Sequence, residues 1–533
     1  MPRMPTASSP FHAANPQDML RKAMALHSQG KLTGAADLYR QLLAVVPNHF
    51  DATHLLGVVH AQTDDRQRAR ELFDKALAIQ PDHPEVHFNR GTLLQAERAF
   101  DDAIADFTST LRGATDHQGA LNHRMVCLEA AGRLDDALAD SDRLLALDPD
   151  NAVYWNNRGK LLTAMMRYDE ALPCLDKAIK SRPDYIEALS NRGNLLAEFH
   201  RFDEAMANYD RVIATRPDFA DAHFAKSQIL LRQGNYDEGW RSFEWRWQQE
   251  GALASKRNFD APLWLGEEDI AGKTIFVHAE QGLGDTVQFC RYLPGIAALG
   301  ARVIVEAPPL LHELLSSLGG IEALVGPRDD TPSVDFHCPM MSLPLAFGTT
   351  LETMPTPQPY LSAAPDLVRS WSARLGAGAK PRVAIAWRGN PVNTHDHKRS
   401  MQLADLLPHL SPEIDWLSLH HQLTASEQEL AARSSNLLTP LDDTTDMTDA
   451  AAICALSDAV LTIDTSMAHI AGALGRPTTV ILSYLPDYPW LLDRDDTPWY
   501  DSVTLLRQGA DRDWTPVIKD AVANVLRCVT PGN

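Results

Sequence analysis

Three consecutive polar residues late in the chain have the spacing of an anion-binding turn. Asp464, Thr465 and Ser466 follow the apolar run "AVLTI" and precede a small-residue helical pattern that ends at Gly475. Backbone N–H groups at the start of such a helix, together with two hydroxyl donors, favour phosphate oxygens. His469 lies one turn inside the same helix. N-capping would use the same side chains, and both roles can hold together, so we expect this turn to bind the phosphate oxygens of a ligand.

A second turn, "EQGLGDT", lies between a strand pattern, "TIFVHA", and a helical pattern. Gly282 and Gly284 form the G-x-G start of a dinucleotide fingerprint, and Glu306 ends the next predicted strand. Val287 occupies the place of the third glycine. A dinucleotide-dependent enzyme is therefore a disfavoured alternative.

Both turns lie in a region of alternating short strands and helices. The first set begins at Lys273, and the second begins at "RVAIAW" and continues through "IDWLSLH" and "AVLTI" to "TTVIL". This order predicts two doubly wound α/β halves, residues 273–370 and 371–533. Ligands of such sheets bind at the carboxyl ends of the strands, so we expect the site between the two halves.

The first half of the chain carries an internal repeat of 34 residues. Prolines, small residues and bulky residues recur at this interval, as in Pro47, Pro81, Pro149, Pro183, Pro217, and Ala35, Ala69, Ala103, Ala137, Ala171, Ala205. The pattern resembles the tetratricopeptide repeat, a helical hairpin that stacks into a superhelix with a concave groove. Seven units fit residues 16–250, with Thr115 in place of the third closing proline.

One repeat position carries polar side chains in four successive units: Asn89, His123, Asn157 and Asn191. In the family this position faces the groove, and the arrangement resembles the asparagine ladder of O-GlcNAc transferases. A side-chain amide donates and accepts, so it can hold a peptide of any sequence by its backbone. Leu55 and Ala225 interrupt the ladder, and the alternative is that these residues cap or solvate helices. A protein or peptide acceptor in the groove is the expected partner.

Three further segments have simpler expectations. Residues 1–15 are expected to be disordered. The aromatic stretch "GWRSFEWRW" and the connector 251–272 are expected to form a hydrophobic seam between the repeats and the α/β region.

The α/β region resembles the heptosyltransferase-like glycosyltransferases of GT-B type. Three motifs carry the resemblance: "GLGD", "AWRGNPVNTHDHKRS" and "TIDTSMAHIAGALGRP". The flanking "DTPWYDSVTLLRQ" is also similar to bacterial members fused to tetratricopeptide repeats. The resemblance implies an α-solenoid followed by a GT-B-type pair of Rossmann-like domains, with the nucleotide-sugar bound by the second.

The resemblance also implies roles for individual residues. Asp285 matches the catalytic aspartate, which removes a proton from the acceptor, although it could instead cap the helix that begins at Thr286. Glu280 and His278 are the reserve bases. The "DTS" turn matches a D-T-G turn that receives the nucleotide diphosphate.

Two cations follow the first strand of the second half. Arg388 and Lys398 are expected to face the crevice and neutralise the departing diphosphate, with Arg399 as a less certain neighbour. Enzymes of this type work without a metal. The histidine pairs at 395/397 and 420/421 lack the i, i+4 spacing of a zinc pair, so we expect no metal and no cofactor, the nucleotide-sugar being a co-substrate.

Composition limits the possible partners. The 533 residues carry a formal net charge of −21 with no basic cluster, which argues against nucleic acid. The six cysteines are scattered, without a C-x-x-C pair, and no apolar run is long enough to span a bilayer. We therefore expect a cytoplasmic protein.

The function expected from these observations is an inverting glycosyltransferase that moves a sugar from a nucleotide-sugar to a protein acceptor held by the repeats. Flagellin is a candidate acceptor by resemblance alone. One alternative is a tetratricopeptide scaffold whose transferase half is inactive. The other is an enzyme like the lipopolysaccharide heptosyltransferases.

Overall fold

The computed structural model describes residues 15–249, 257–327, 329, 333–355, 358–391, 396–442 and 444–530. The expected disordered segment, residues 1–15, lies outside this description except for Asn15. The chain forms two compact units, residues 1–195 and 196–533. The boundary falls inside helix α11 (Ile186–Glu198), earlier than the boundary at residue 250 that the repeat pattern suggests.

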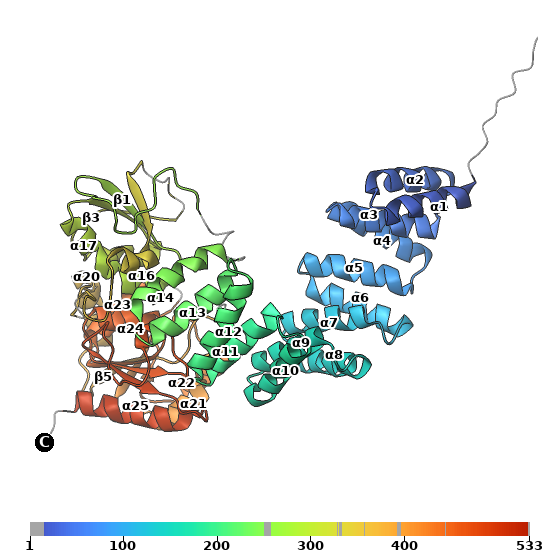
Figure 1. Ribbon diagram of the computed structural model, residues 1–533. Helices are drawn as coiled ribbons and strands as arrows, with labels where there is room; N and C mark the ends of the chain where they lie inside the picture. The colour runs from blue at the N-terminus through green and yellow to red at the C-terminus, as the bar shows by residue number, and fades with distance from the viewer. Residues whose placement is uncertain are drawn as a thin grey trace, which may run out of the picture. The chain divides into compact units, whose positions relative to one another are not determined.

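The first unit consists of helices, paired into hairpins (Figure 1). Their bounds are α1 Pro16–Ser28, α2 Leu32–Val45, α3 Phe50–Gln62, α4 Arg66–Ile79, α5 Pro84–Ala96, α6 Phe100–Gly113, α7 Gln118–Ala130, α8 Leu134–Leu147, α9 Ala152–Ala164 and α10 Tyr168–Ser181. The pattern continues in the second unit with α12 Phe202–Thr215, α13 Ala220–Arg232 and α14 Tyr236–Phe243.

Each hairpin turns through one residue in the left-handed backbone region. These residues lie 34 positions apart and have φ between 55° and 77°: Gly30, Asp64, Arg98, Gly132, Met166, His200 and Gly234. A left-handed residue just after a helix ends it by redirecting the chain. In the described residues, seven such turns lie at the 34-residue spacing of the predicted hairpins.

The small residues of the repeat lie where two helices touch. A Cβ atom added at Gly57 would approach the Phe73 ring to 2.8 Å, and one at Gly91 would approach Phe107 to 2.9 Å. Only a residue without a side chain allows this approach, because the ring would otherwise have to shift. The structure thus explains the periodic glycines by packing.

Ion pairs between neighbouring repeats follow the same period, although the repeat pattern did not predict them. They join an acidic residue to a basic residue sixteen positions later: Asp74–Arg90, Asp142–Arg158 and Asp176–Arg192 in the first unit, and Asp210–Lys226 in the second. Each exposed pair stabilises the folded chain by less than about 1 kcal/mol. The pairs therefore contribute mainly to the alignment of neighbouring repeats.

The second unit contains two parallel sheets. The first has the order β3-β2-β1-β4, with β1 Thr274–His278, β2 Arg302–Glu306, β3 Ile321–Val325 and β4 Phe336–Pro339. The second has the order β10-β9-β8-β5-β6-β7, with β5 Arg382–Ala386, β6 Asp415–Ser418, β7 Leu437–Leu438, β8 Ala459–Ile463, β9 Thr478–Leu482 and β10 Val503–Arg507. Counted from its first strand, the second sheet has the Rossmann order 3-2-1-4-5-6, and the predicted parallel α/β halves are confirmed.

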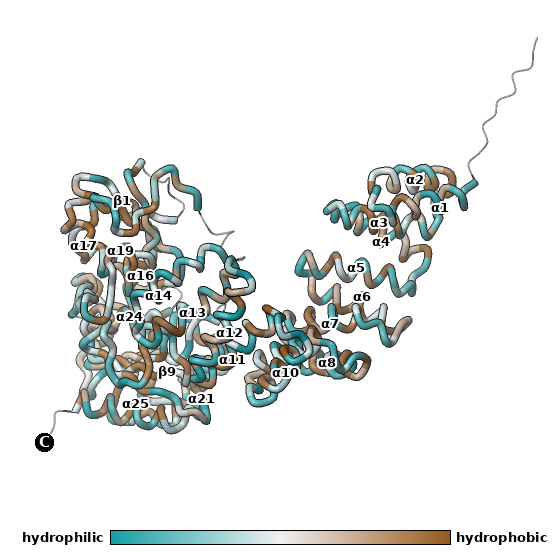
Figure 2. The backbone as a smooth tube through the Cα atoms, viewed as in Figure 1, coloured by the Kyte–Doolittle hydropathy of each residue, from teal (hydrophilic) through white to brown (hydrophobic). Residues whose placement is uncertain are grey.

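Helices cover these sheets. They are α16 Leu283–Phe289, α17 Leu293–Ala298, α18 His312–Leu315, α19 Leu343–Ala346, α20 Pro365–Leu375, α21 Leu403–Leu406, α22 Ala425–Ala432, α23 Met447–Leu456, α24 Ser466–Ala473 and α25 Trp514–Val529. The last of these, α25, packs against β8 and β9 (Figure 1). Strands β8 and β9 are buried along their whole length, and β9 is coloured as hydrophobic in Figure 2.

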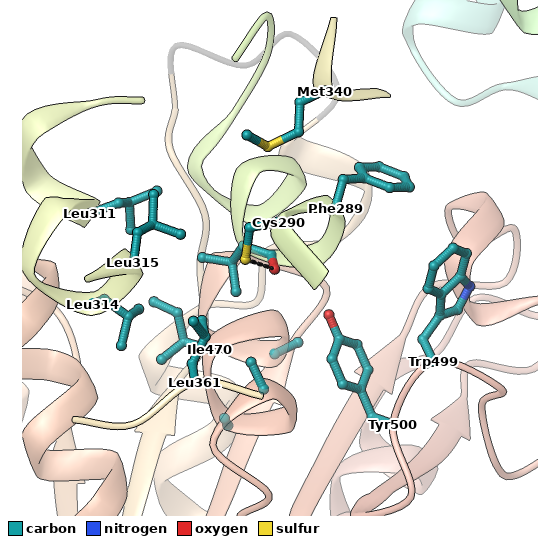
Figure 3. Close-up of a cluster of buried hydrophobic side chains, with 14 of the residues drawn as sticks. Phe289, Cys290, Leu311, Leu314, Leu315, Met340, Leu361, Ile470, Trp499 and Tyr500 are labelled. Carbon is teal, nitrogen blue, oxygen red and sulfur yellow. Dashed lines mark hydrogen bonds between the residues drawn. The ribbon is translucent and has the colours of Figure 1, made fainter. Parts of the chain in front are cut away.

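One hydrophobic core joins the two α/β halves to the last repeat. Side chains from both halves, including Cys290, Leu315, Ile470 and Tyr500, gather in one cluster (Figure 3). Trp240 of α14 belongs to the same core and is 1% exposed. The predicted aromatic seam is therefore present, although residues 250–256 of the connector lie outside the described part of the chain.

Two edge-to-face ring contacts fix this seam. The Trp240 ring lies 6.0 Å from Phe289 of α16 and 5.6 Å from Tyr488, centroid to centroid. Such contacts stabilise beyond the area they bury.

In the described residues, no helix combines the length and apolarity needed to cross a bilayer.

Candidate functional site

A cavity of about 430 Å³ lies in the second unit, where the loops that follow several strands converge. Its walls come from the segments after β1, β4, β5, β8 and β9, and from repeat helices α11, α13 and α14. The residues are Glu198, Phe224, Gln228, Arg232, Phe243, Gln281, Asp285, Met341, Lys398, Arg399, Asp464, Ser483, Leu485, Asp487 and Tyr488. The predicted residues Asp285, Lys398 and Asp464 are thus brought together at the carboxyl ends of the strands.

Asp285 lies in the first turn of α16 and also lines the cavity. The Gly282 N–H donates to its Oδ2 at 3.0 Å, so the carboxylate caps its own turn. Burial, followed by the neighbouring carboxylate of Asp487, raises the pKa of Asp285 to about 7. A carboxylate that titrates near neutral pH can accept a proton from a substrate hydroxyl.

The Asp464–Ser466 turn connects buried strand β8 to helix α24. Thr465 is the N-cap, and its Oγ1 accepts from the Met467 N–H at 3.4 Å. Asp464 is 8% exposed and lines the cavity, and burial raises its pKa above the usual range. Within the described residues, Thr465 and Ser466 do not line the cavity.

Gly284 brings the two predicted turns together. A Cβ atom added there would lie 3.0 Å from His469 Cδ2 and 3.4 Å from Ser466 Cα. A contact of 3.0 Å is tighter than most real Cβ contacts, so a side chain at this position would require His469 or the turn to shift slightly. The second glycine of the "GLGD" motif, Gly284, therefore allows a close contact between the helix and the turn.

His469 is held within aromatic packing. Its Nδ1 lies 2.9 Å from the Tyr500 hydroxyl, and its ring stacks on Trp490 at 5.1 Å. Burial lowers its pKa to about 3, so the imidazole is neutral. The structure places His469 behind the turn and not among the described cavity walls.

The two cations that follow β5 in the cavity have carboxylate partners. Lys398 Nζ lies 2.5 Å from Glu198 Oε1, and Arg399 Nε lies 3.2 Å from Asp396 Oδ1. Both cations remain partly exposed, at 30% and 26% of their side chains, and can reach a ligand in the cavity. Both therefore fit the predicted role beside a diphosphate, which the structure does not test.

Arg388 is placed differently. It follows β5, but its Nε donates to Glu427 Oε1 of α22 at 2.9 Å, and its Nη2 donates to the Gln422 carbonyl. The side-chain hydrogen bonds of Glu427 outweigh its burial and lower its pKa to about 2. Among the described residues, Arg388 does not line the cavity of Asp285 and Lys398.

The two reserve bases are engaged elsewhere. Both oxygens of Glu280 accept from buried Arg246, at 2.8 and 2.9 Å. His278 lies 3.4 Å from His337, and burial lowers its pKa to about 3. Asp285 is therefore the better placed of the three candidates.

The histidines considered for a metal lie apart. His420 accepts from the Trp387 N–H at 3.2 Å, and His421 Nδ1 lies 3.0 Å from Thr445 Oγ1. His395 lies outside the described residues. The described part of the chain contains no group of three or more potential metal ligands.

The ladder residues of the first unit bond to side chains of the preceding repeat. The pairs are Asn89–His54 at 2.8 Å, His123–Gln95 at 2.7 Å, Asn157–Asn122 at 2.9 Å and Asn191–Asn156 at 2.9 Å. In the two Asn–Asn pairs the later residue donates one N–H, and a side-chain amide has two donors and an acceptor. Some bonding capacity therefore remains for a peptide, and its binding stays a prediction.

Sequence reasoning missed the contribution of the last repeats to the cavity. Glu198, Phe224, Gln228 and Arg232 belong to helices that the 34-residue period already explained. Asp487 could have been found, because it follows β9 and the loops after parallel strands form such sites. Nothing in the local sequence marks Glu198.

The fold combines tetratricopeptide repeats in the first part of the chain with a two-sheet parallel α/β region. Family models of the tetratricopeptide repeat match residues 20–84, 88–152, 152–185 and 190–239. The repeats thus extend over about the first 240 residues.

A relative is Protein FlbA of Caulobacter vibrioides, 25% identical over 318 residues, which cover 54% of this chain and 52% of FlbA. The chain therefore matches about half the length of that relative. Among solved structures, a tetratricopeptide repeat protein from Parabacteroides merdae is 18% identical, with a TM-score of 0.39, over 46% of this chain and 94% of its own. YrrB, described as a tetratricopeptide repeat protein with an unusual peptide-binding site, is 19% identical, with a TM-score of 0.32, over 36% of this chain and 98% of its own.

Proposed function

We propose that the protein is an inverting glycosyltransferase of GT-B type that transfers a sugar from a nucleotide-sugar to a protein acceptor. The observation that carries the proposal is the convergence of Asp285, Lys398 and Asp464 on one cavity at the carboxyl ends of strands from two parallel sheets. Ligands of doubly wound sheets bind at this edge.

The reaction assigns a task to each side of the cavity. Asp285 accepts the proton of the acceptor nucleophile while that atom bonds to the anomeric carbon. The bond from the anomeric carbon to the diphosphate breaks, and the nucleoside diphosphate leaves with the electron pair. Lys398 and Arg399 lie where they can stabilise its growing negative charge.

A second cavity supports a place for the nucleoside. It measures about 460 Å³, lies at the ends of β6 and β7, and is lined by His421, Gln422, Leu423, Gln428, Thr439, Leu441 and Asp442. Arg388 donates to the Gln422 carbonyl and so holds one wall of it. In the proposal, Arg388 positions the nucleoside side of the site and Lys398 the phosphate side.

The acceptor side is supported by the last repeat. Phe224, Gln228 and Arg232 of α13 are spaced four residues apart, so they lie along one helix face, and all three line the cavity. A protein acceptor brought by the repeats would meet the reacting groups beside these side chains.

A tetratricopeptide interaction protein with an inactive α/β half is the second candidate. The observation that favours it is the Lys398–Glu198 ion pair. In this pair Glu198 already binds the lysine that the first proposal assigns to the diphosphate. A lipopolysaccharide heptosyltransferase-like activity would leave the repeat-derived cavity wall without a purpose.

A nucleotide-sugar panel tests the proposal on the full chain. A ligand that binds only the folded state stabilises it, by about 2.7 kcal/mol when its concentration is a hundred times its Kd. The melting temperature rises as a result. We expect one nucleotide-sugar to stabilise the wild type and to be hydrolysed slowly, and Lys398→Ala to weaken both effects. Binding of a nucleotide-sugar without hydrolysis or transfer to any protein would favour the interaction protein.

A further inference from the structure

The carboxylate of Glu198 lies between two cations at the edge of the main cavity. Its Oε1 is 2.5 Å from Lys398 Nζ, and its Oε2 is 3.3 Å from Arg512 Nη2. Glu198 is the last residue of α11 and is 7% exposed. A buried carboxylate from the repeat segment thus holds a lysine that faces the cavity.

Arg512 holds Glu198 by more than this ion pair. Its Nη2 also donates to the Glu198 carbonyl at 2.9 Å, and its guanidinium lies 5.3 Å from the Tyr484 ring centroid. Arg512 has φ 58°, a strained conformation that persists only where the surroundings fix it. Glu198 therefore keeps a cationic partner when Lys398 moves away.

Two cations that share one carboxylate give the cluster of Glu198, Lys398 and Arg512 one positive charge in excess. The Lys398 side chain is 30% exposed and that of Arg512 is 26% exposed. Of these two cations, Lys398 alone lines the described cavity. A lysine is also a compact cation on a flexible stem and can exchange partners readily. Lys398 is thus the member that can turn to a ligand.

We propose that Glu198 is an internal competitor for the anion that binds Lys398. Ligand phosphate oxygens replace the Glu198 carboxylate at the ammonium group, while Arg512 keeps Glu198 neutralised. The inference rests on the proposed function in naming this anion as the diphosphate of a nucleotide-sugar. A residue of the repeat segment thereby sets the affinity for the donor.

The size of the effect follows from competition. If Lys398 is released from Glu198 only a fraction of the time, the apparent affinity for an anion equals the intrinsic affinity multiplied by that fraction. Removing the negative charge at position 198 should remove the reduction.

Pyrophosphate is a suitable probe, because it carries the diphosphate without a base or a sugar. We expect Glu198→Gln in the full chain to bind pyrophosphate about 3- to 10-fold more tightly than the wild type, measured by calorimetry. Lys398→Ala should abolish the gain when it is combined with Glu198→Gln. The control is Glu204→Gln, which removes the same charge from an exposed pair with Arg201 and should leave the affinity unchanged.

Glu198→Asp provides a second variant if the glutamine variant melts below the assay temperature. The shorter side chain lengthens the contact with Lys398 and should also tighten pyrophosphate binding, by a smaller factor. Unchanged or weaker binding in the folded variants, or no pyrophosphate binding by any of them, overturns the inference. Tighter binding without sugar transfer would instead overturn the proposed function, and transfer with an unchanged affinity would overturn the inference alone.

Discussion

Asp285 combines two roles that sequence reasoning treats as alternatives. Its Oδ2 accepts from the Gly282 N–H, as a capping residue does, and its carboxyl group also lines the cavity. The capping bond stabilises the ionised form, but burial and Asp487 have the larger effect and raise its pKa to about 7. The turn therefore orients the carboxylate, and its surroundings adjust the basicity.

Asp285→Asn should leave nucleotide binding intact and lower sugar transfer. Loss of a general base typically costs about 10²- to 10⁴-fold in rate. In the wild type, kcat/KM should rise with pH through about 7, because the base acts when it is deprotonated. Steady-state rates between pH 5 and 9 measure both effects.

Asp487→Asn is the control for the pH profile. The neighbouring carboxylate raises the pKa of Asp285, so its removal should move the acidic limb to lower pH. A transfer rate of Asp285→Asn equal to that of the wild type would exclude the assigned role.

Arg388→Ala should lower stability more than it lowers diphosphate affinity. The substitution leaves Glu427, which is 8% exposed, without its ionic partner, at a cost of about 1–3 kcal/mol. Because the folded pKa of Glu427 is lowered to about 2, its stabilising contribution is present above about pH 4.5 and is lost as the pH falls through 2. Urea unfolding at pH 7 and pH 3 should therefore show a smaller wild-type advantage at pH 3.

Arg433→Ala is the matched control, at the C-cap of the helix that carries Glu427. Arg433 pairs with Glu429, and both side chains are about 70% exposed, so its loss should cost less than about 1 kcal/mol at either pH. A stability cost for Arg388→Ala as small as the cost for Arg433→Ala would contradict the buried-pair assignment.

At the scale of elements, local patterns were predictable and distant pairings were not. The 34-residue period and the strand–turn–helix motifs each lie within a short stretch of sequence, and they predicted the hairpins and the parallel α/β halves. The partner of Arg388 lies 39 residues away and that of Lys398 lies 200 residues away. No local signal specifies such contacts, because they depend on how completed elements pack.

The hairpin turns offer a test of the repeat geometry. Met166 has φ 57° and is 50% exposed, so glycine there relieves strain and loses little buried surface. We expect Met166→Gly to raise the free energy of unfolding by about 0.5–1 kcal/mol, after the added entropy of the unfolded chain is subtracted. Met165→Gly is the control and should destabilise, because Met165 has φ −81° and packs against the repeat core. Urea unfolding of the full chain measures both, and an equal loss in the two variants would be incompatible with a left-handed turn.

At the scale of the whole molecule, the repeat pattern and the compact units divide the chain at different places. The sequence places the end of the solenoid near residue 250, whereas the second compact unit begins at Leu196. Helices α12 to α14 thus belong to the repeat by sequence and to the α/β unit by packing. They contribute Trp240 to its core and Arg232 to its cavity.

Two truncations distinguish these boundaries. A chain of residues 196–533 keeps the aromatic seam and every described wall of the cavity. We expect it to unfold cooperatively and to bind pyrophosphate. A chain of residues 251–533 loses Trp240 and Phe243, and each large buried aromatic contributes about 3–5 kcal/mol. It should melt at a far lower temperature or aggregate, as circular dichroism and light scattering would show.

The chain of residues 196–533 also separates acceptor binding from chemistry. If the ladder residues of the first unit hold the acceptor, residues 196–533 should lose transfer to the protein acceptor but keep slow hydrolysis of the donor. Changing Asn157 and Asn191 together to Ala in the full chain should give a milder version, since each lost backbone hydrogen bond contributes about 0.5–1.5 kcal/mol. Normal transfer to the protein acceptor by residues 196–533 would remove the first unit from acceptor recognition. A well-folded, pyrophosphate-binding chain of residues 251–533 would show that the last repeats are dispensable for the fold and for the cavity.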